Sequence, residues 1–138
     1  MTALYADASA LLRVLFNEPG SRAPLEKGGV AVTSRIAEIE TFRAVDRARL
    51  QGHLTDMQTA RKLSELAGLL SRLHLVPVSD DIIALARQPF AVNVRAIDAI
   101  HVATAQMLTA EVGPIAFWTH DVRQATAALS RGLDVNGA

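Results

Sequence analysis

The stretch Leu4-Tyr5-Ala6-Asp7-Ala8-Ser9-Ala10-Leu11-Leu12 contains the unit from which the chain is built. Its first three residues have the apolar character of a short buried strand, and residues 8–16 carry apolar side chains at helical spacing. Asn17-Glu18-Pro19-Gly20 then ends the helix. The stretch therefore predicts a β-to-α unit with one acidic residue, Asp7, at its junction.

A second β-to-α unit follows, and it is extended by another helix. Residues 30–33 predict a strand, and Ser34 is a good N-cap for a helix that runs to about Leu50. Thr55 can cap the next helix, in which leucines recur at helical spacing as far as about Leu73. We expect these two helices to form a hairpin.

The rest of the chain continues the alternation of strands and helices. Predicted strands are residues 75–78, 114–118 and 133–135, and predicted helices are residues 79–88, 98–109 and 122–131, with a loop at residues 89–94. Parallel neighbours in a sheet need right-handed helical crossovers, so this alternation indicates a parallel sheet covered by helices on both faces. The predicted fold class is α/β.

Length and composition indicate one domain. The chain has 138 residues, half of them apolar, which suits a single domain over residues 1–138 with one buried core. No uninterrupted apolar run approaches the roughly 18 residues of a membrane span, and the amino terminus lacks the features of a signal peptide. We therefore expect a soluble, cytoplasmic protein. The absence of cysteine excludes disulfides and thiolate metal sites.

The charge balance leaves nucleic-acid binding open. Fourteen basic and fourteen acidic residues give a net charge of zero, without the basic excess of many nucleic-acid binders. Only Lys27 and Lys62 are lysines, and the remaining basic residues are arginines, whose planar fork suits phosphate recognition. An arginine-rich composition also follows from a GC-rich coding sequence.

Four acidic residues lie near junctions between a strand and a helix: Asp7, Glu40, Asp98 and Asp121. Acids that follow successive parallel strands converge at the carboxyl edge of the sheet. Carboxylates without cysteine or a closely spaced histidine pair favour Mg²⁺ or Mn²⁺ over zinc. The corresponding reaction is attack of metal-activated water on a phosphodiester. The acids repel one another without metal, so we expect metal binding to stabilise the fold.

Each acid also has a structural interpretation. Asp7 and Asp121 have the position and residue type of helix N-caps. Asp98 is the hardest acid to explain structurally, because a carboxylate beside an apolar stretch is costly to bury without a cation or donors. The sequence alone leaves both interpretations open.

The acid on the second helix is ambiguous in two ways. Glu40 faces small and apolar neighbours, but Arg43 and Arg47 are close enough along the helix to pair with it. Glu38 lies in the first turns of the same helix, and spacing does not decide between it and Glu40.

Three further polar residues have positions that support such a site. Ser9 and Thr119, each two residues from an acid, have hydroxyls able to orient water or metal, or to form turns. His101 lies one turn after Asp98, where a core or supporting role is expected rather than metal ligation.

Four segments in order along the chain resemble those of PIN-domain ribonucleases, especially the VapC-type toxins of bacterial toxin–antitoxin pairs. The matching segments are Asp7-Ala-Ser9-Ala10, Ser34 with Glu40-Thr-Phe-Arg43-Ala44, Arg95-Ala-Ile-Asp98-Ala-Ile-His101-Val-Ala-Thr-Ala, and Thr119-His-Asp121 with Ala127-Ala128 and Gly132-Leu133-Asp134-Val135. The third is similar to the family signature Leu-Asp-Ala-Ile-His-Leu-Ala-Thr-Ala. The likeness covers nearly the full chain and selects Glu40 over Glu38.

The resemblance implies a three-layer α/β/α sandwich with a small, mainly parallel central sheet. It implies an endoribonuclease that uses Mg²⁺ or Mn²⁺, forms a homodimer and is inhibited by a cognate antitoxin. The implied catalytic and metal-binding residues are Asp7, Glu40, Asp98 and Asp121, with possible support from Ser9, Thr119, Arg43 and His101.

Several surfaces are candidates for contact with RNA. With a neutral overall charge, an RNA groove must be built from local arginines such as Arg13, Arg35, Arg43 or Arg95. Arg43 has the alternative role of orienting Glu40. We expect substrate specificity in residues 19–29 and 89–94, because loops on a rigid scaffold carry specificity.

The helix at residues 8–16 has more apolar side chains than one buried stripe needs: Leu11, Leu12, Val14, Leu15 and Phe16. Either part of this helix receives the antitoxin, or the helix is packed entirely into the core. In the first case, Leu15→Glu releases antitoxin with little change in melting temperature; in the second, it disrupts folding.

Two alternative functions remain at this stage. A PIN-like domain without catalysis would act only as a binding module. A receiver-type phospho-acceptor domain is also a small α/β fold with an acidic pocket, but Asp7 lacks the acidic neighbour, and the second half of the chain lacks the lysine, that a receiver needs.

Overall fold

A computed structural model of the chain describes residues 3–20, 25 and 29–137, and it contains one five-stranded parallel sheet. The strand order is β3-β2-β1-β4-β5. The strands are β1 (Ala3–Ala6), β2 (Val30–Ser34), β3 (His74–Val76), β4 (Ile115–Trp118) and β5 (Asp134–Asn136). In the central register, Leu4 of β1 lies opposite Ala31 of β2 and Ala116 of β4. Because every pairing is parallel, the carboxyl ends of all five strands meet at one edge.

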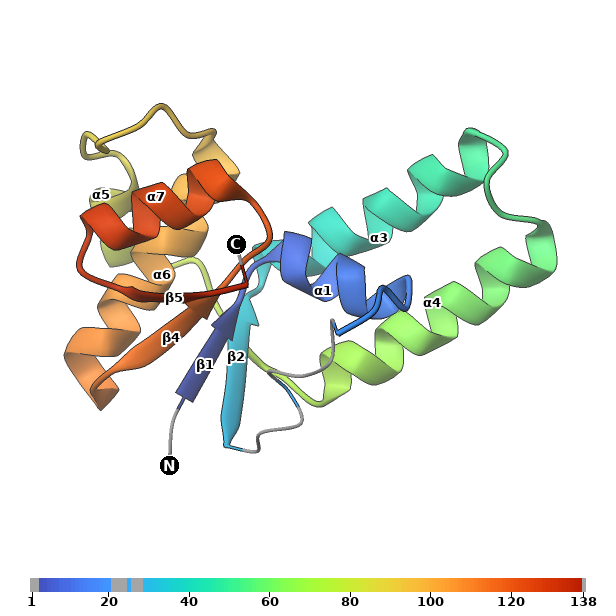
Figure 1. Cartoon of the computed structure of the whole chain (residues 1–138), viewed down its shortest axis with the longest axis horizontal. Helices are drawn as coiled ribbons and strands as arrows, with labels where there is room; N and C mark the ends of the chain where they lie inside the picture. Colours follow the sequence, from blue (N-terminus) through green and yellow to red (C-terminus); the bar gives the residue numbers. More distant parts are fainter. Residues whose placement is uncertain (1–2, 21–24, 26–28, 138) are drawn as a thin grey trace.

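Helices cover both faces of this sheet, as Figure 1 shows. Those on one side are α1 (Ala8–Leu15), α3 (Ile36–Leu50) and α4 (Asp56–Ser71), and those on the other are α5 (Asp80–Ala86), α6 (Ala96–Val112) and α7 (Val122–Ser130). The predicted hairpin is present, with α3 packed on α4 and its far end projecting away from the sheet (Figure 1). The prediction of a three-layer α/β/α sandwich is confirmed.

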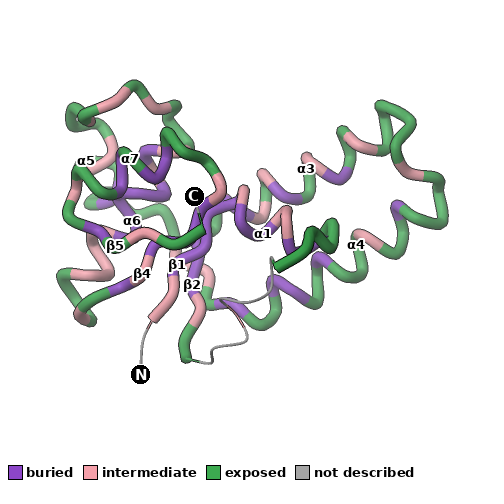
Figure 2. The backbone as a smooth tube through the Cα atoms, viewed as in Figure 1, coloured by how far each residue is buried: buried purple, intermediate pink, exposed green. Residues whose placement is uncertain are grey.

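The two faces of the sheet bury two separate cores. Ala6 and Trp118 point into the core beneath α1, α3 and α4, whereas Tyr5 and Phe117 point into the core beneath α6 and α7. This separation follows from the strand period of two, which sends successive side chains to opposite faces. In Figure 2 the buried segments concentrate along β1, α1 and the helices against the sheet, while the tip of the α3–α4 hairpin is largely exposed.

Predicted helix boundaries are confirmed at some junctions and wrong at others. Thr55 caps α4 through a capping box, and Ser79 caps α5 by accepting a hydrogen bond from the Ile82 amide. Ser34 is not the N-cap of α3: it ends β2, and Arg35 occupies the cap position. The Ser34 hydroxyl still accepts a hydrogen bond from the first helical amide, at 3.1 Å.

Several elements differ from their predicted bounds by one to three residues, and α6 and β3 have an identifiable cause. Helix α6 begins at Ala96 and continues to Val112, beyond the predicted 98–109, because Arg95 accepts the first helical hydrogen bond and Gly113, at φ 95°, is the residue that ends it. Strand β3 starts at His74 and stops at Val76, because Pro77 has no amide to donate to the ladder.

Helix α1 packs most of its apolar side chains into the core, which favours the second of the two interpretations of residues 8–16. Leu11, Val14 and Leu15 are 0%, 1% and 3% exposed. Leu12 is half-buried, and Phe16, just after the helix, is exposed. The extra apolar residues are needed because α1 contacts β1 as well as α3 and α4.

None of the helices within residues 3–20, 25 and 29–137 is both long and apolar enough to cross a membrane. Of the two loops predicted to carry specificity, residues 19–29 fall largely outside the described residues.

We predict that Leu15→Ala lowers the free energy of unfolding by about 2 to 5 kcal/mol, because it leaves a cavity between α1 and the hairpin. Urea denaturation followed by circular dichroism measures this change. Leu129→Ala is the matched control: Leu129 lies on α7 and is 60% exposed, so its loss should change stability by less than about 0.5 kcal/mol. Equal effects of the two substitutions would contradict the burial of Leu15.

Candidate active site

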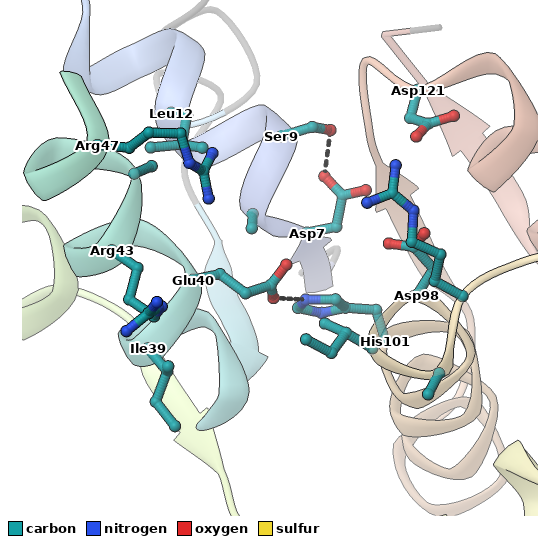
Figure 3. Close-up of a pocket in the computed structure, with 15 residues that line it drawn as sticks. Asp7, Ser9, Leu12, Ile39, Glu40, Arg43, Arg47, Asp98, His101 and Asp121 are labelled. Atoms are coloured by element: carbon teal, nitrogen blue, oxygen red, sulfur yellow. Dashed lines mark hydrogen bonds and ion pairs between the residues drawn. The ribbon is translucent and has the colours of Figure 1, made fainter. Parts of the chain in front are cut away.

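All four acids identified in the sequence line one pocket of about 690 Å³ at the carboxyl edge of the sheet. They come from four elements: Asp7 precedes α1, Glu40 lies in α3, Asp98 in α6, and Asp121 precedes α7. Figure 3 shows that these side chains approach the pocket from both helical layers. The pocket is therefore assembled between the layers rather than within one of them.

Asp7 is the most firmly held of the four. It is 3% exposed, and its backbone amide donates to the Trp118 carbonyl at 3.1 Å, which extends the pairing of β1 with β4. Oδ1 accepts from the Ser9 hydroxyl at 2.6 Å and the Ala10 amide at 3.0 Å. Oδ2 accepts from the Thr119 hydroxyl at 2.5 Å. Asp7 is thus the N-cap of α1 and also lines the pocket, so its capping role does not remove it from the candidate site.

The hydroxyls of Ser9 and Thr119 lie 3.2 Å apart and also receive backbone amides. The amide of His120 donates to Ser9 at 3.0 Å, and the amide of Asp121 donates to Thr119 at 3.1 Å. Both hydroxyls act as turn-forming groups and as donors to a carboxylate. They fix Asp7 against the loop that carries Asp121.

Glu40 bonds to a histidine instead of an arginine. Its Oε1 is 2.5 Å from Nε2 of His101, and the opposite ring nitrogen, Nδ1, is 2.6 Å from the Tyr5 hydroxyl. The predicted alternative of a helix salt bridge is wrong, because neither Arg43 nor Arg47 pairs with Glu40 within the described residues. Glu38, the competing acid, pairs with Arg35 and does not line the pocket.

Asp98 and Asp121 are less enclosed. Asp121 caps α7, with Oδ1 accepting from the amides of Arg123 and Gln124 at 2.9 and 3.2 Å. The side chain of Gln124 then donates to the Asp98 backbone carbonyl at 3.0 Å, which joins α7 to α6. The Asp98 carboxylate has no hydrogen-bonding partner among residues 3–20, 25 and 29–137.

Two of the four acids, Asp98 and Asp7, are costly to ionise, and the pKa of each is raised. Burial raises the pKa of Asp98, and the charges of Asp121, Glu40 and Asp7 raise it further. Burial also raises the pKa of Asp7, although its hydroxyl donors oppose the shift. A cation in the pocket would relieve both effects.

The donor chemistry of the pocket fits a hard divalent cation. It presents carboxylate oxygens, and one of these carboxylates, on Asp98, is unpartnered. As the side chains stand, no three acidic or histidine groups in the described part of the chain converge closely enough to hold one ion. For several of these groups to bind one ion, side chains must rotate or water molecules must lie between them and the ion. Mg²⁺ ordinarily keeps several of its bound waters.

The sequence indicates Ser9, Thr119, Arg43 and His101 as supporting residues but gives no sign of two others, Tyr5 and Gln124. Tyr5 bonds to His101, and Gln124 bonds to the backbone carbonyl of Asp98. No local pattern signals either role, because the atoms they bind belong to residues far away in the sequence.

The PIN domain family model matches residues 4–128. The chain belongs to the PIN domain family. Among its relatives is "Ribonuclease VapC46" of Mycobacterium tuberculosis, which is 33% identical over 138 residues, covering 98% of this chain and 97% of the relative. These coverages span the whole pocket, so the four acids lie in the matched region.

Solved structures show the same fold. VapBC2 from Rickettsia felis, crystallised bound to a DNA fragment from its promoter, matches with a TM-score of 0.72 and 12% identity, over 98% of each chain. A toxin–antitoxin complex from Klebsiella pneumoniae matches with a TM-score of 0.63 and 19% identity, over 88% of each chain. At these identities the likeness concerns the PIN fold alone.

We predict that Asp98→Asn stabilises the metal-free PIN domain at neutral pH. The raised pKa means that folded Asp98 holds more protons than unfolded Asp98 above the ordinary value of 3.8. Stability should therefore fall as pH rises from 3.8 through the raised pKa, and the amide variant should lose this decline. Thermal unfolding between acid and neutral pH, in EDTA, measures the effect.

Asp134→Asn is the control for this experiment, because Asp134 is an exposed acid of β5 outside the pocket. Its melting temperature should follow the wild-type pH profile. A neutral-pH melting temperature for Asp98→Asn at or below that of the wild type would contradict the repulsion.

Proposed function

We propose that this PIN domain is an endoribonuclease that uses Mg²⁺ or Mn²⁺ and acts as the toxin of a toxin–antitoxin pair. The observation that carries the proposal is the convergence of Asp7, Glu40, Asp98 and Asp121 from four elements onto one pocket. The name of the 33% identical relative, a ribonuclease, supports RNA as the substrate. The three-layer fold and the sequence motifs are consistent with both.

The residues of the pocket have distinct roles in this proposal. Asp7, held at both oxygens, provides a rigid carboxylate, and Glu40 provides a second one that His101 orients. Asp98 and Asp121 provide carboxylate oxygens on the opposite wall. A bound Mg²⁺ or Mn²⁺ supplies Lewis acidity and neutralises charge on the phosphate.

Three arginines at the pocket are suited to the phosphates of the strand. Arg43, Arg47 and Arg95 line the pocket with the acids, and within the described residues their guanidinium groups have no ion-pair or hydrogen-bond partner. Two other sequence candidates are already engaged. Arg13 binds His120 and Glu18, and Arg35 pairs with Glu38.

The pocket continues into a neighbouring pocket of about 440 Å³. Both are lined by Arg95, Asp98 and Asp121, and the second adds Arg123, which donates to the Asn93 carbonyl at 3.1 Å. The predicted specificity loop at residues 89–94 thus contributes Asn93 and Val94. We infer that a single RNA strand crosses from one pocket into the other over Asp98.

The partner in this proposal rests on two of the solved structures with the same fold. The VapBC2 structure and the toxin–antitoxin complex support a cognate antitoxin as partner. A homodimer and a cytoplasmic location are part of the same proposal. We also infer that residues 1–138 act as one domain, because one sheet includes strands from both ends of the chain.

Two alternatives to this function differ in what they predict. A catalytically inactive PIN-like module would bind RNA or antitoxin without cleavage. A receiver-type domain is disfavoured by the strand order β3-β2-β1-β4-β5, because receivers have the order 2-1-3-4-5. Lys62 also lies away from the acids, paired with Glu65.

We predict that the purified, antitoxin-free protein cleaves total cellular RNA into discrete products with Mg²⁺ or Mn²⁺ and not with EDTA. Asp98→Asn, verified as folded by circular dichroism, should lower the rate at least about 100-fold because a carboxylate of the pocket is lost. Asp134→Asn should cleave at the wild-type rate. Cleavage that is equal in Asp98→Asn and wild type would indicate a contaminating nuclease, and no cleavage by either would favour the binding module.

Binding of RNA tests the proposed strand path separately from cleavage. In the Asp98→Asn background, Arg95→Ala and Arg123→Ala should each weaken binding of a fluorescent single-stranded RNA. Each should also reduce the slope of log affinity against log salt by about 0.7, the value for one lost phosphate contact. Fluorescence anisotropy at several salt concentrations measures both.

Arg61→Ala is the matched control for these arginines. Arg61 is an exposed arginine of α4 that lines neither pocket. Its substitution removes the same charge, so an equal change in salt slope would mean that the effect is general electrostatics and not a strand path.

A further inference from the structure

A chain of short hydrogen bonds leads from the interior of the sheet to the Glu40 carboxylate. The Tyr5 hydroxyl lies 2.6 Å from Nδ1 of His101, and Nε2 of His101 lies 2.5 Å from Oε1 of Glu40. Tyr5 is 0% and His101 1% exposed, whereas the Glu40 side chain is 22% exposed. Figure 3 shows the outer end of this chain, where His101 on α6 reaches Glu40 on α3.

The inner end of the chain is held by packing. The Tyr5 ring stacks on Phe117 with centroids 5.3 Å apart and an interplanar angle of 10°, and it meets the His101 ring edge-on at 5.8 Å. Tyr5 is on the central strand β1 and Phe117 is on the neighbouring β4, so the tyrosine is fixed by these two paired strands. His101 therefore has a rigid partner on the side away from the pocket.

The direction of the hydrogen bonds follows from the chemistry of the groups at its ends. A carboxylate oxygen only accepts hydrogen bonds, so Nε2 of His101 donates to Glu40. With the ring proton on Nε2, Nδ1 is the acceptor and the Tyr5 hydroxyl is the donor at the inner end.

We propose that Tyr5 and His101 form a positioning brace that fixes one oxygen of Glu40 and leaves the other available to a cation. The proposal rests on the proposed function, since it assigns Glu40 a metal-binding role. In this arrangement neither the Tyr5 side chain nor the His101 ring contacts RNA. Tyr5 lies on β1, two residues before Asp7, so the brace places Glu40 relative to the most rigid acid of the pocket.

The brace is tested by three substitutions that separate its parts. Tyr5→Phe removes the hydroxyl and keeps the stacking ring. His101→Asn places its amide near the position of Nδ1 and loses the donor to Glu40, whereas the longer His101→Gln places an amide donor near the position of Nε2. Thr59→Val on α4 is the control, because it also removes one hydroxyl hydrogen bond, to Thr55, at a site remote from the pocket.

Calorimetric titration with Mn²⁺ alone is the first measurement. Loss of a residue that orients a metal ligand typically lowers metal affinity about 10- to 100-fold, so Tyr5→Phe and His101→Asn should weaken Mn²⁺ binding by about tenfold or more. His101→Gln should retain more affinity than His101→Asn. Thr59→Val should lower the melting temperature without changing Mn²⁺ affinity. Wild-type affinity in Tyr5→Phe would overturn the brace, because a purely structural hydroxyl affects only stability.

Nitrogen-15 spectra of histidine-labelled protein without metal test the proton assignment directly. At neutral pH, Nε2 of His101 should have the chemical shift of a protonated nitrogen and Nδ1 that of a bare acceptor, and Tyr5→Phe should shift Nδ1. A proton on Nδ1, alone or together with one on Nε2, would overturn the assignment.

These measurements separate failure of the brace from failure of the proposed function. If the wild type binds no Mn²⁺ and cleaves no RNA, the metal-dependent function fails, while the histidine spectra still decide whether the Tyr5–His101–Glu40 chain has the proposed polarity. If the wild type binds Mn²⁺ and cleaves RNA but the two brace variants match it in affinity, only the brace fails. If the brace holds, folded variants that lack it should cleave RNA with a reduced kcat and little change in KM.

Discussion

Parallel pairing of β1 with β2 on one side and β4 on the other is the constraint on which this molecule depends. It aligns the carboxyl ends of the strands, and the Asp7 amide extends the pairing by one bond to the Trp118 carbonyl. Every element that carries a pocket residue leaves the sheet at or beyond this edge. Because all the strands run in one direction, the pocket brings together residues that lie more than a hundred positions apart in the sequence.

Helices from both outer layers hold the acids of the pocket in place. Helices α1 and α3 position Asp7 and Glu40 from one layer, and α6 and α7 position Asp98 and Asp121 from the other. Contacts across the layers then set the spacing: Thr119 to Asp7 and His101 to Glu40 are both hydrogen bonds of 2.5 Å. A change in how either layer packs on the sheet is transmitted to the acids through these two contacts.

The pocket is a site where stability and function oppose each other. Natural domains ordinarily pair or solvate their carboxylates, yet Asp98 has no donor among the described residues and its neighbours repel it. Arg43, Arg47 and Arg95 line the same pocket without pairing with its acids. Such an arrangement is costly in the metal-free protein and would become favourable with a cation and a phosphate bound, which is the pattern expected of a binding site rather than of a structural ion-pair network.

The sequence by itself determined the class of the fold and three of the four acids that line the pocket, and the family resemblance added Glu40. Alternating strand and helix patterns specify a parallel sheet because parallel neighbours need crossovers, and acids such as Asp7 and Asp98 stand out because their local neighbours are apolar. Only the tertiary structure decided which side chains meet. Spacing along α3 did not separate Glu38 from Glu40, and nothing local connects Tyr5 to His101, because hydrogen bonds between residues 96 positions apart depend on how the layers pack. The burial of Leu15 was decided in the same way, since one helix contacts both the sheet and the α3–α4 hairpin, and a periodic pattern alone does not show how many partners a helix has.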